Sequence, residues 1–337
     1  MTKTTDTYSP APDLVVAVCG SRTARRHFAA EYGASRVDGH AAGAPDVRVE
    51  VGFAARLPAD VPAGGHKTVR WAVAVGPLGR PLTSSVVLAG APRSFGLSLV
   101  QGFVVEPLVS LTAPRAGHVL LPAAALADEE GAVVVLGRSR SGKTSVVARA
   151  LAAGYLALGD DQVLIDASGA VRSWPRRLRV YPDLRWTAPA AVSALPAHKR
   201  LRLTALAAAA RASGGWVAPS LPLSYGDVGG AAAAGPIPVR RIVVVQRGGS
   251  AANLSASALE ASSVGDIARE VLRQQRSRLR AVLGAEAEAV LRTVEEQEAA
   301  ILKQALSDIP AEVWTVPQDW PAPLAVRALA DRLKLRS

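Results

Sequence analysis

Residues 13–115 alternate short apolar runs with turns rich in glycine and proline. Five runs have the length and composition of β-strands: DLVVAVCG, DVRVEVGFAARL, KTVRWAVAVG, LTSSVVLAG and GFVVEPLVSL. In VRVEV, apolar and polar residues alternate with a period of two, and RTARRHFAAEYG favours a helix. The pattern predicts a β-rich N-terminal domain over residues 13–115. The polar residues 1–12 before it are expected to be a disordered tail.

A different pattern begins at residue 116. HVLLPAAALA predicts a strand, DEEG a turn, and the continuous apolar run AVVVLG a strand buried on both faces. After a loop, Val146, Val147, Ala150 and Leu151 recur at helical spacing, and Gly154 is a typical helix end. YLALGDDQVLID predicts one further strand. The order of strand, loop, helix and strand is that of an α/β unit.

The rest of the chain gives fewer assignments. Residues 169–240 are rich in proline, glycine and arginine and are left unassigned. Further on, RRIVVVQRG predicts a buried strand, 263–309 a helix interrupted near Gly284, AEVWTVP a last strand and PLAVRALADRLKLRS a terminal helix. We therefore expect an α/β fold with a second domain over 116–337.

The loop after AVVVLG carries a recognisable pattern. Residues 137–144, GRSRSGKT, match G-x-x-x-x-G-K-[ST], the P-loop, in which backbone N–H groups surround phosphate oxygens at a helix N-terminus. The lysine would reach the β- and γ-phosphates, and the threonine hydroxyl would bind Mg²⁺. A glycine- and serine-rich turn with a solvated lysine is the alternative. The residues expected to bind nucleotide are Gly137, Arg138, Ser139, Arg140, Ser141, Gly142, Lys143, Thr144 and Ser145.

Two adjacent acids, Asp160 and Asp161, follow one helix after this loop. Strand ends of an α/β unit meet at one edge of the sheet, so we expect both carboxylates near the phosphates. One would hold Mg²⁺ together with Thr144, and the other would accept the proton of an attacking hydroxyl. The pattern does not assign these two roles. Lys143, Asp160 and Asp161 are the candidate catalytic residues.

The spacing of these elements resembles the HPr kinase/phosphorylase family. The run from LLPAAAL through GRSRSGKT to GDDQVLID resembles in particular the HPr-kinase-like serine kinases, which include lasso-peptide tailoring enzymes. WPRRLRVYPD, HKRLRL and PIPVRRIVVVQRG are weaker matches. The resemblance implies a core like that of phosphoenolpyruvate carboxykinase, ATP (or GTP) and Mg²⁺ as ligands, and a serine or threonine of a peptide or small carrier protein as acceptor.

Two residues depart from the family pattern. Pro122 stands where many relatives have a histidine, and proline has no acid–base function. Arg140 stands where relatives usually have glycine. A non-catalytic nucleotide-binding scaffold or sensor, and a kinase of a small-molecule alcohol, therefore remain as alternatives to a peptide kinase.

The amino-acid composition limits the classes of binding partner that we expect. Lysine and arginine number 39 against 28 acids, a net charge of +11 that suits phosphates or an acidic peptide. No nucleic-acid-binding motif accompanies this charge, so nucleic acid is not an expected partner. The basic residues Arg176, Arg177 and Arg179 could bind phosphate or an acidic substrate or form a solvated face, and Lys199 and Arg200 could contact a triphosphate or the solvent.

The location also follows from composition. Cys19 is the single cysteine, the first residues lack the apolar core of a secretory signal, and no uninterrupted apolar run reaches the ~20 residues that span a bilayer. We expect a cytoplasmic protein without a membrane segment. The C-terminal helix, rich in arginine early and glutamate late, is compatible with oligomer contacts.

Overall fold

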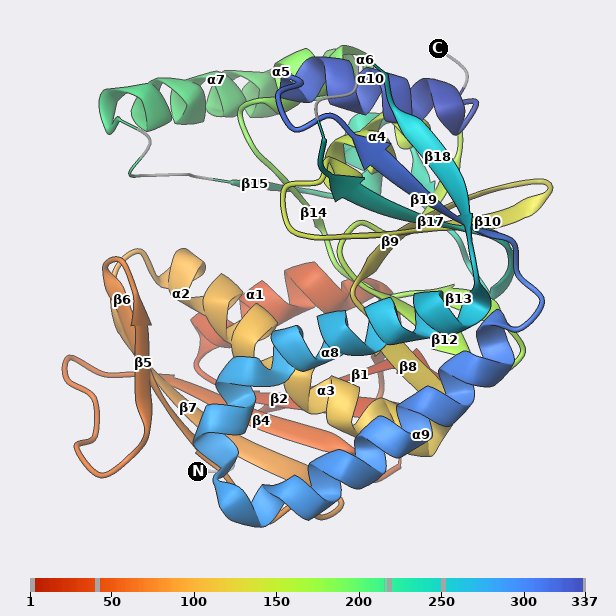
Figure 1. Cartoon of the computed structure of the whole chain (residues 1–337). Helices are drawn as coiled ribbons and strands as arrows, with labels where there is room; N and C mark the ends of the chain where they lie inside the picture. Colours follow the sequence, from red (N-terminus) through yellow and green to blue (C-terminus); the bar gives the residue numbers. More distant parts are fainter. Residues whose placement is uncertain (1–3, 40–42, 215, 217–219, 250–252, 336–337) are drawn as a thin grey trace. The chain divides into compact units, whose positions relative to one another are not determined.

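The computed structural model describes residues 4–39, 43–214, 216, 220–249 and 253–335, and it is a mixed α/β protein (Figure 1). The chain forms two compact units. The first contains the residues up to Leu120 together with Arg269–Leu302, and the second contains Leu121–Ala268 together with the residues from Lys303 on.

The first unit is built on a seven-stranded sheet in the order β3-β1-β2-β4-β7-β6-β5. In β4, Val47, Val49 and Val51 are buried and Arg48 is exposed, which confirms the period-two alternation read from the sequence. Strand β4 is parallel to both β2 and β7, and the other pairs are antiparallel. The strands are β1 (Thr5–Ala11), β2 (Leu14–Gly20), β3 (Arg36–Val37), β4 (Val47–Phe53), β5 (Ala63–His66), β6 (Val69–Val75) and β7 (Leu82–Gly90).

The predicted disorder of residues 1–12 is wrong for most of that segment. Thr5–Ala11 form β1, in which Tyr8 is buried and pairs with Val16 of β2. The polar Asp6 is buried as well, because Arg36 lies 2.7 Å and Arg25 3.6 Å from its carboxylate. These two arginines are far from Asp6 in the sequence, so the neighbouring residues alone suggest an exposed carboxylate, whereas in the fold the arginines neutralise it. Residues 1–3 lie outside the described residues.

The prediction of a strand at GFVVEPLVSL is also wrong, because these residues belong to one long helical segment. It consists of α2 (Arg93–Val100), the π-helical η2 (Gln101–Val105), α3 (Glu106–Thr112) and the 3-10 turn η3 (Ala113–Ala116). Gln101 and Glu106 are fully buried, and the Gln101 amide donates to the Glu106 carboxylate at 3.0 Å. The segment 93–116 is long and apolar enough to cross a membrane, but 72% of its most apolar window is buried in the fold, as in the core helix of a soluble protein.

The other helices of the first unit come from distant parts of the chain. Helix α1 (Arg22–Tyr32) begins at Ser21, whose hydroxyl accepts the Ala24 N–H at 3.2 Å, and ends in the turn η1 (Gly33–Ser35). The helix expected over 263–309 is present as α8 (Ala261–Leu283), η5 (Ala285–Ala287) and α9 (Glu288–Leu306). Gly284 separates them at φ +74°, which confirms the predicted interruption. A buried ion pair between Arg276 and Glu298 joins the two helices.

The sheet of the second unit runs in the order β16-β11-β9-β10-β17-β19-β18, and β13 and β12 extend it from the start of β17. Strands β10, β17 and β19 are mutually parallel, and β9 lies antiparallel between β10 and β11. The strands are β8 (His118–Leu121), which leads in from the first unit, β9 (Ala123–Asp128), β10 (Gly131–Gly137), β11 (Leu156–Gly159), β12 (Val163–Asp166), β13 (Ala170–Ser173), β16 (Ala231–Ala232), β17 (Ile237–Arg247), β18 (Ser255–Leu259) and β19 (Ala311–Val316).

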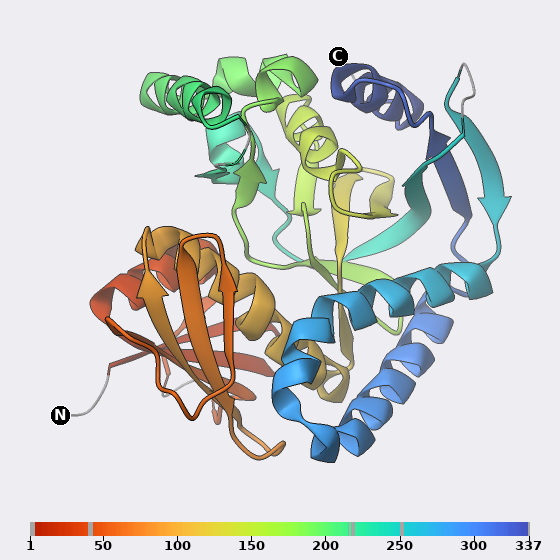
Figure 2. The same cartoon turned by 60° about the vertical axis from the view of Figure 1, so that its left-hand side comes forward.

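Helices of the second unit pack around the first helix after β10. This helix, α4 (Lys143–Ala152), contacts β9, β11, α6 and α10, and Gly154 at φ +90° follows its end as predicted. The previously unassigned segment contains a small separate sheet of β14 (Leu178–Val180) and β15 (Leu221–Leu223). The helices are α4, α5 (Leu184–Thr187), α6 (Pro189–Ala194), α7 (Ala197–Ala212), the turn η4 (Tyr225–Val228) and α10 (Ala322–Arg332) (Figure 2).

Substitution of Trp314 in β19 tests the packing of the second unit. Its side chain is fully buried, and the guanidinium groups of Arg241 and Arg332 lie over its ring. We expect Trp314→Ala to lower the free energy of unfolding by about 3–5 kcal/mol through lost burial and a residual cavity. Urea denaturation followed by circular dichroism measures the change. Trp216→Ala, at a tryptophan that is 60% exposed, is the matched control and should change it by no more than about 0.5 kcal/mol. Equal losses in both variants would contradict this assignment of the core.

Candidate functional site

The loop Gly137–Gly142 joins the buried strand β10 to α4. A Cβ atom at Gly137 would lie 2.8 Å from the Val245 carbonyl oxygen, so only glycine fits between β10 and β17. Gly142, immediately before α4, has φ +98°. Arg140 also has a positive φ, +67°, at the position where the resembled family usually has glycine. The loop therefore holds an arginine in a conformation that glycine adopts more readily.

Lys143 is the first residue of α4, and its side chain folds back over the loop. The ammonium group donates to the carbonyl oxygens of Gly137 at 2.6 Å and Arg138 at 3.1 Å. The side chain is only 9% exposed, and burial lowers the pKa of Lys143, whereas the charges of Asp161 and Asp160 act in the opposite direction. The lysine is thus a buried cation held inside the loop that it follows.

The two aspartates occupy a tight turn at the end of β11. A Cβ atom at Gly159 would lie 2.1 Å from the Gln162 carbonyl oxygen, so glycine is needed for this turn. The segment YLALGDDQVLID, predicted to be one strand, is therefore two strands, β11 and β12, with Asp160 and Asp161 between them. Because β10 and β11 run in the same direction on either side of β9, their carboxyl ends lie at the same edge.

The aspartates differ in environment. Asp160 is 4% exposed, and the Thr144 hydroxyl, on the first turn of α4, donates to its Oδ2 at 3.4 Å. The Asp161 side chain is 56% exposed and pairs with the Arg176 guanidinium at 3.0 Å. The structure thus brings Lys143, Thr144, Asp160 and Asp161 together at one sheet edge, with one buried and one accessible carboxylate.

Burial, and after it the nearby charge of Asp161, raise the pKa of Asp160 to about 6. The charges of Arg176 and Arg179 and a hydrogen bond from the Arg179 backbone N–H act in the opposite direction. A buried carboxylate is costly unless charge or hydrogen bonds compensate it. An added cation beside Asp160 would therefore favour its ionised form.

Thr187 and Tyr225 also belong to this region, and neither was predicted because both fall in the unassigned segment. The Thr187 hydroxyl of α5 donates to Ser145 Oγ at 2.9 Å, and Arg149 donates to the Thr187 carbonyl at 3.2 Å. Tyr225 of η4 has a buried hydroxyl with no hydrogen-bond partner among the described residues. Burial and then the charge of Asp160 raise the pKa of Tyr225, so its hydroxyl stays protonated.

Lys199 and Arg200, the two basic residues considered as triphosphate contacts, have different partners in the structure. Lys199 forms an ion pair with Asp227 at 2.5 Å, and Asp227 also accepts the Ser224 backbone N–H at 2.7 Å. These bonds tie the start of α7 to η4. Arg200 is exposed and donates to the Ser193 carbonyl at 3.3 Å.

The register of β9 against β10 shows that Pro122 lies beside the loop. It precedes Ala123, which pairs with Leu136, so Pro122 is adjacent to the carboxyl end of β10. A proline at this position supplies no proton donor or acceptor in its side chain. His118, four residues earlier, begins β8 and belongs to the first unit.

The donor set suits a metal that arrives with a nucleotide. Within the described part of the chain, no group of three or more His, Cys, Asp or Glu residues is placed to hold a metal ion. Mg²⁺ is commonly bound by one or two carboxylates together with phosphate oxygens and water. The Thr144 hydroxyl and the Asp160 carboxylate match that requirement, and Asp161 is close enough in sequence to contribute.

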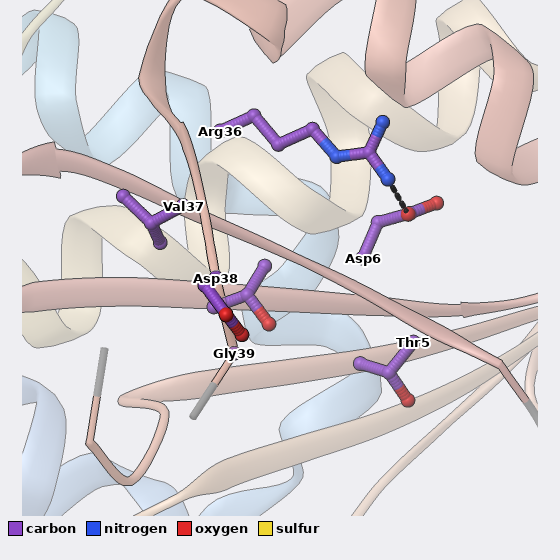
Figure 3. Close-up of a pocket in the computed structure, with 7 residues that line it drawn as sticks. Thr5, Asp6, Arg36, Val37, Asp38 and Gly39 are labelled. Carbon is purple, nitrogen blue, oxygen red and sulfur yellow. Dashed lines mark hydrogen bonds and ion pairs between the residues drawn. The ribbon is translucent and has the colours of Figure 1, made fainter. Parts of the chain in front are cut away.

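The first unit contains a pocket whose lining differs chemically from the candidate site around the loop Gly137–Gly142 (Figure 3). The carboxylate of Asp6 and the guanidinium of Arg36 neutralise each other across it at 2.7 Å. It is lined by Thr5, Asp6, Thr7, Arg36, Val37, Asp38 and Gly39. None of the residues expected to bind nucleotide lines this pocket.

Comparison with models of known protein families finds no match, and comparison with curated protein sequences finds none either.

The raised pKa of Asp160 predicts an effect of pH on stability. The unfolded chain ionises this carboxyl near its ordinary pKa of 3.8, whereas the folded protein retains the proton to about pH 6. Ionisation therefore destabilises the fold increasingly between these values and fully above them. Without nucleotide or divalent cations, we expect Asp160→Asn to raise the free energy of unfolding at pH 8 by about 1–2 kcal/mol.

Urea denaturation at pH 4 and pH 8 measures this difference. Near pH 4 the Asp160→Asn variant and the wild type should have nearly equal stability, because the carboxyl is then mostly protonated in the folded state. The exposed Asp319→Asn is the control and should show no such pH-dependent gain. A gain of the same size at both pH values would contradict the proposed burial of a charge.

Proposed function

We propose that the protein transfers a phosphoryl group from ATP, or alternatively GTP, to a hydroxyl acceptor. The observation that carries the proposal is the approach of Thr144 Oγ1 to Asp160 Oδ2, 3.4 Å, at a helix N-terminus that follows a glycine loop. This juxtaposition provides a hydroxyl and a carboxylate for a cation directly beside backbone N–H groups for phosphates. The resemblance to HPr-kinase-like proteins agrees with this combination.

Binding of the triphosphate is assigned to the loop and to Lys143. The N-terminus of α4 and the loop N–H groups favour anionic oxygens. The ammonium group of Lys143 is already inside the loop, and its bonds to the Gly137 and Arg138 carbonyls would be replaced by bonds to phosphate oxygens. A lowered pKa of a buried lysine is reversed by the arrival of negative charge, so the bound nucleotide keeps Lys143 protonated.

The two aspartates take different roles because their exposure differs. Asp160, buried beside Thr144, holds the cation, which supplies neutralising charge to the phosphates when it is bound. Asp161, exposed to solvent, accepts the proton from the attacking hydroxyl. Arg176, paired with Asp161, is placed to stabilise the charge that develops on the transferred group.

A serine or threonine of a peptide or small carrier protein is the acceptor that the resemblance favours. Pro122, in place of the histidine of the resembled family, favours the alternative of a non-catalytic nucleotide sensor, since the proline side chain supplies no proton donor or acceptor beside β10. A small-molecule alcohol is the second alternative, because the acceptor side of the site does not itself specify a peptide.

Nucleotide binding is tested with Lys143→Ala. We expect this variant to bind a non-hydrolysable ATP analogue in the presence of Mg²⁺ at least about tenfold more weakly, because a charge-assisted contact to phosphate is lost. Isothermal titration calorimetry measures the affinity. The exposed Lys303→Ala is the matched control and should bind as the wild type does. Unchanged affinity in Lys143→Ala would remove the loop from the nucleotide site.

Phosphoryl transfer is tested with γ-labelled ATP, Mg²⁺ and two acceptors, a serine-containing synthetic peptide and glycerol. We expect Asp161→Asn to reduce transfer by about 10²–10⁴-fold while leaving the analogue affinity nearly unchanged, because it removes a base and not a phosphate contact. Asp319→Asn serves as control. Labelling of glycerol alone would favour the small-alcohol kinase, and intact nucleotide binding without any transfer would favour the sensor.

A further inference from the structure

The positive charge of the chain is concentrated in one segment. Residues 170–212 contain nine arginines and lysines and a single acid, Asp183. This segment alone has a net charge of +8, whereas the whole chain has +11. Two of these cations pair with acids outside the segment, Arg176 with Asp161 and Lys199 with Asp227, and the excess that remains favours an anionic partner.

Large exposed apolar side chains are found in the same part of the second unit. Tyr181 is 51% exposed, Trp186 63% and Leu201 71%. Monomeric proteins expose large aromatic side chains sparingly, and those beside a functional site are often binding residues. The segment therefore combines charge with apolar contact area.

Several cations of this surface remain available for a partner. Arg185, Arg200 and Arg202 form no ion pair with any acid in the part of the chain that the structure describes. The Arg185 guanidinium lies over the Trp186 ring at 5.3 Å from its centroid, and its Nη2 is buried without a hydrogen-bond acceptor. Arg200 and Arg202 project from an exposed part of α7.

This surface is fixed to the candidate site by direct bonds. Thr187, next to Trp186, donates to Ser145 of α4, and Arg176, shortly before Tyr181, pairs with Asp161. Arg200 of α7 donates to the Ser193 carbonyl of α6. Helices α5, α6 and α7 are neighbours in both views of the second unit (Figures 1 and 2). These bonds link the segment that carries Tyr181 and Trp186 to α4 and to the accessible carboxylate, and they link α7 to α6.

We infer that Tyr181, Arg185, Trp186, Arg200, Leu201 and Arg202 form a docking surface for an acidic, extended peptide segment of the acceptor. Carboxylates of the peptide pair with the arginines, and an aliphatic or aromatic side chain packs on Trp186. A serine or threonine hydroxyl next to this segment reaches Asp161. The position of the hydroxyl rests on the proposed function, whereas binding of the acidic segment does not require phosphoryl transfer.

A peptide fits this surface better than a nucleic acid does. The exposed Asp161 lies at the inner end of the surface, and its carboxylate would repel a chain with a phosphate at every unit. A peptide can place a neutral serine there and acidic residues only farther out, beside the arginines. The three exposed apolar side chains also suit the mixed composition of a peptide.

Fluorescence anisotropy tests the inference with two labelled peptides of twelve residues, about 40 Å when extended. One contains glutamates around a phenylalanine and a serine, and the other has glutamine in place of every glutamate. We expect the acidic peptide to bind the full-length protein about tenfold more tightly, with affinity falling as salt is added. Trp186→Ala and Arg200→Glu/Arg202→Glu should each weaken binding about tenfold.

Matched measurements keep the test independent of the nucleotide site. Arg22→Glu/Arg26→Glu changes the net charge equally on α1 and should bind the acidic peptide as the wild type does. All surface variants should retain wild-type affinity for the ATP analogue, whereas Lys143→Ala should bind the analogue at least about tenfold more weakly and bind the peptide as the wild type does. Equal binding of both peptides, or equal losses in the α1 variant, would overturn the inference. Tighter, surface-dependent binding of a single-stranded RNA oligonucleotide would overturn it in favour of a nucleic-acid site.

Discussion

The burial of two opposite charges at the ends of two apolar strands is the constraint on which the second unit depends. Lys143 and Asp160 are both almost fully buried. Loop carbonyls accept hydrogen bonds from the lysine, whereas the Thr144 hydroxyl and the Arg179 N–H offset only part of the cost of the aspartate charge, as its raised pKa shows. Buried charges without a direct counter-ion are costly. Glycines at 137 and 159 permit close backbone approaches beside these groups, to the carbonyl oxygens of Val245 and Gln162, and Gly142 adopts the positive φ that precedes α4.

The same constraint explains why the surrounding helices are fixed. Thr187 and Arg149 join α5 to α4, and the Lys199–Asp227 ion pair joins α7 to η4, so the elements around the loop cannot shift separately. A preorganised group of donors and acceptors loses little free energy when charge arrives. The proposed roles of the two aspartates follow from this rigidity, since one carboxylate is enclosed by packed elements and the other is not.

The parts of this arrangement that depend on residues close together in the sequence could be predicted from the sequence. Apolar runs and helical spacing located β10, α4, β17, β19 and α10, and the spacing of GRSRSGKT and GDD placed four candidate residues at one sheet edge. Contacts between distant residues were not predictable. Asp6 is neutralised by Arg36 within β1, in a stretch that looks polar, and the apolar stretch predicted as a strand is instead helical beside the Gln101–Glu106 hydrogen bond. Thr187 and Tyr225 reach the site through a segment with no periodic pattern.

The helical hairpin of α8 and α9 has a consequence for synthesis of the protein. Arg269–Leu302 complete the first unit, although its sheet is finished before residue 91. A ribosome therefore releases β10 and α4 of the second unit before the helices that complete the first unit exist. During that interval the nascent sheet and the 93–116 helix lack their final covering, and domains emerging from the ribosome otherwise tend to fold in order. The first unit can therefore reach its final packing only after residue 302 has been synthesised.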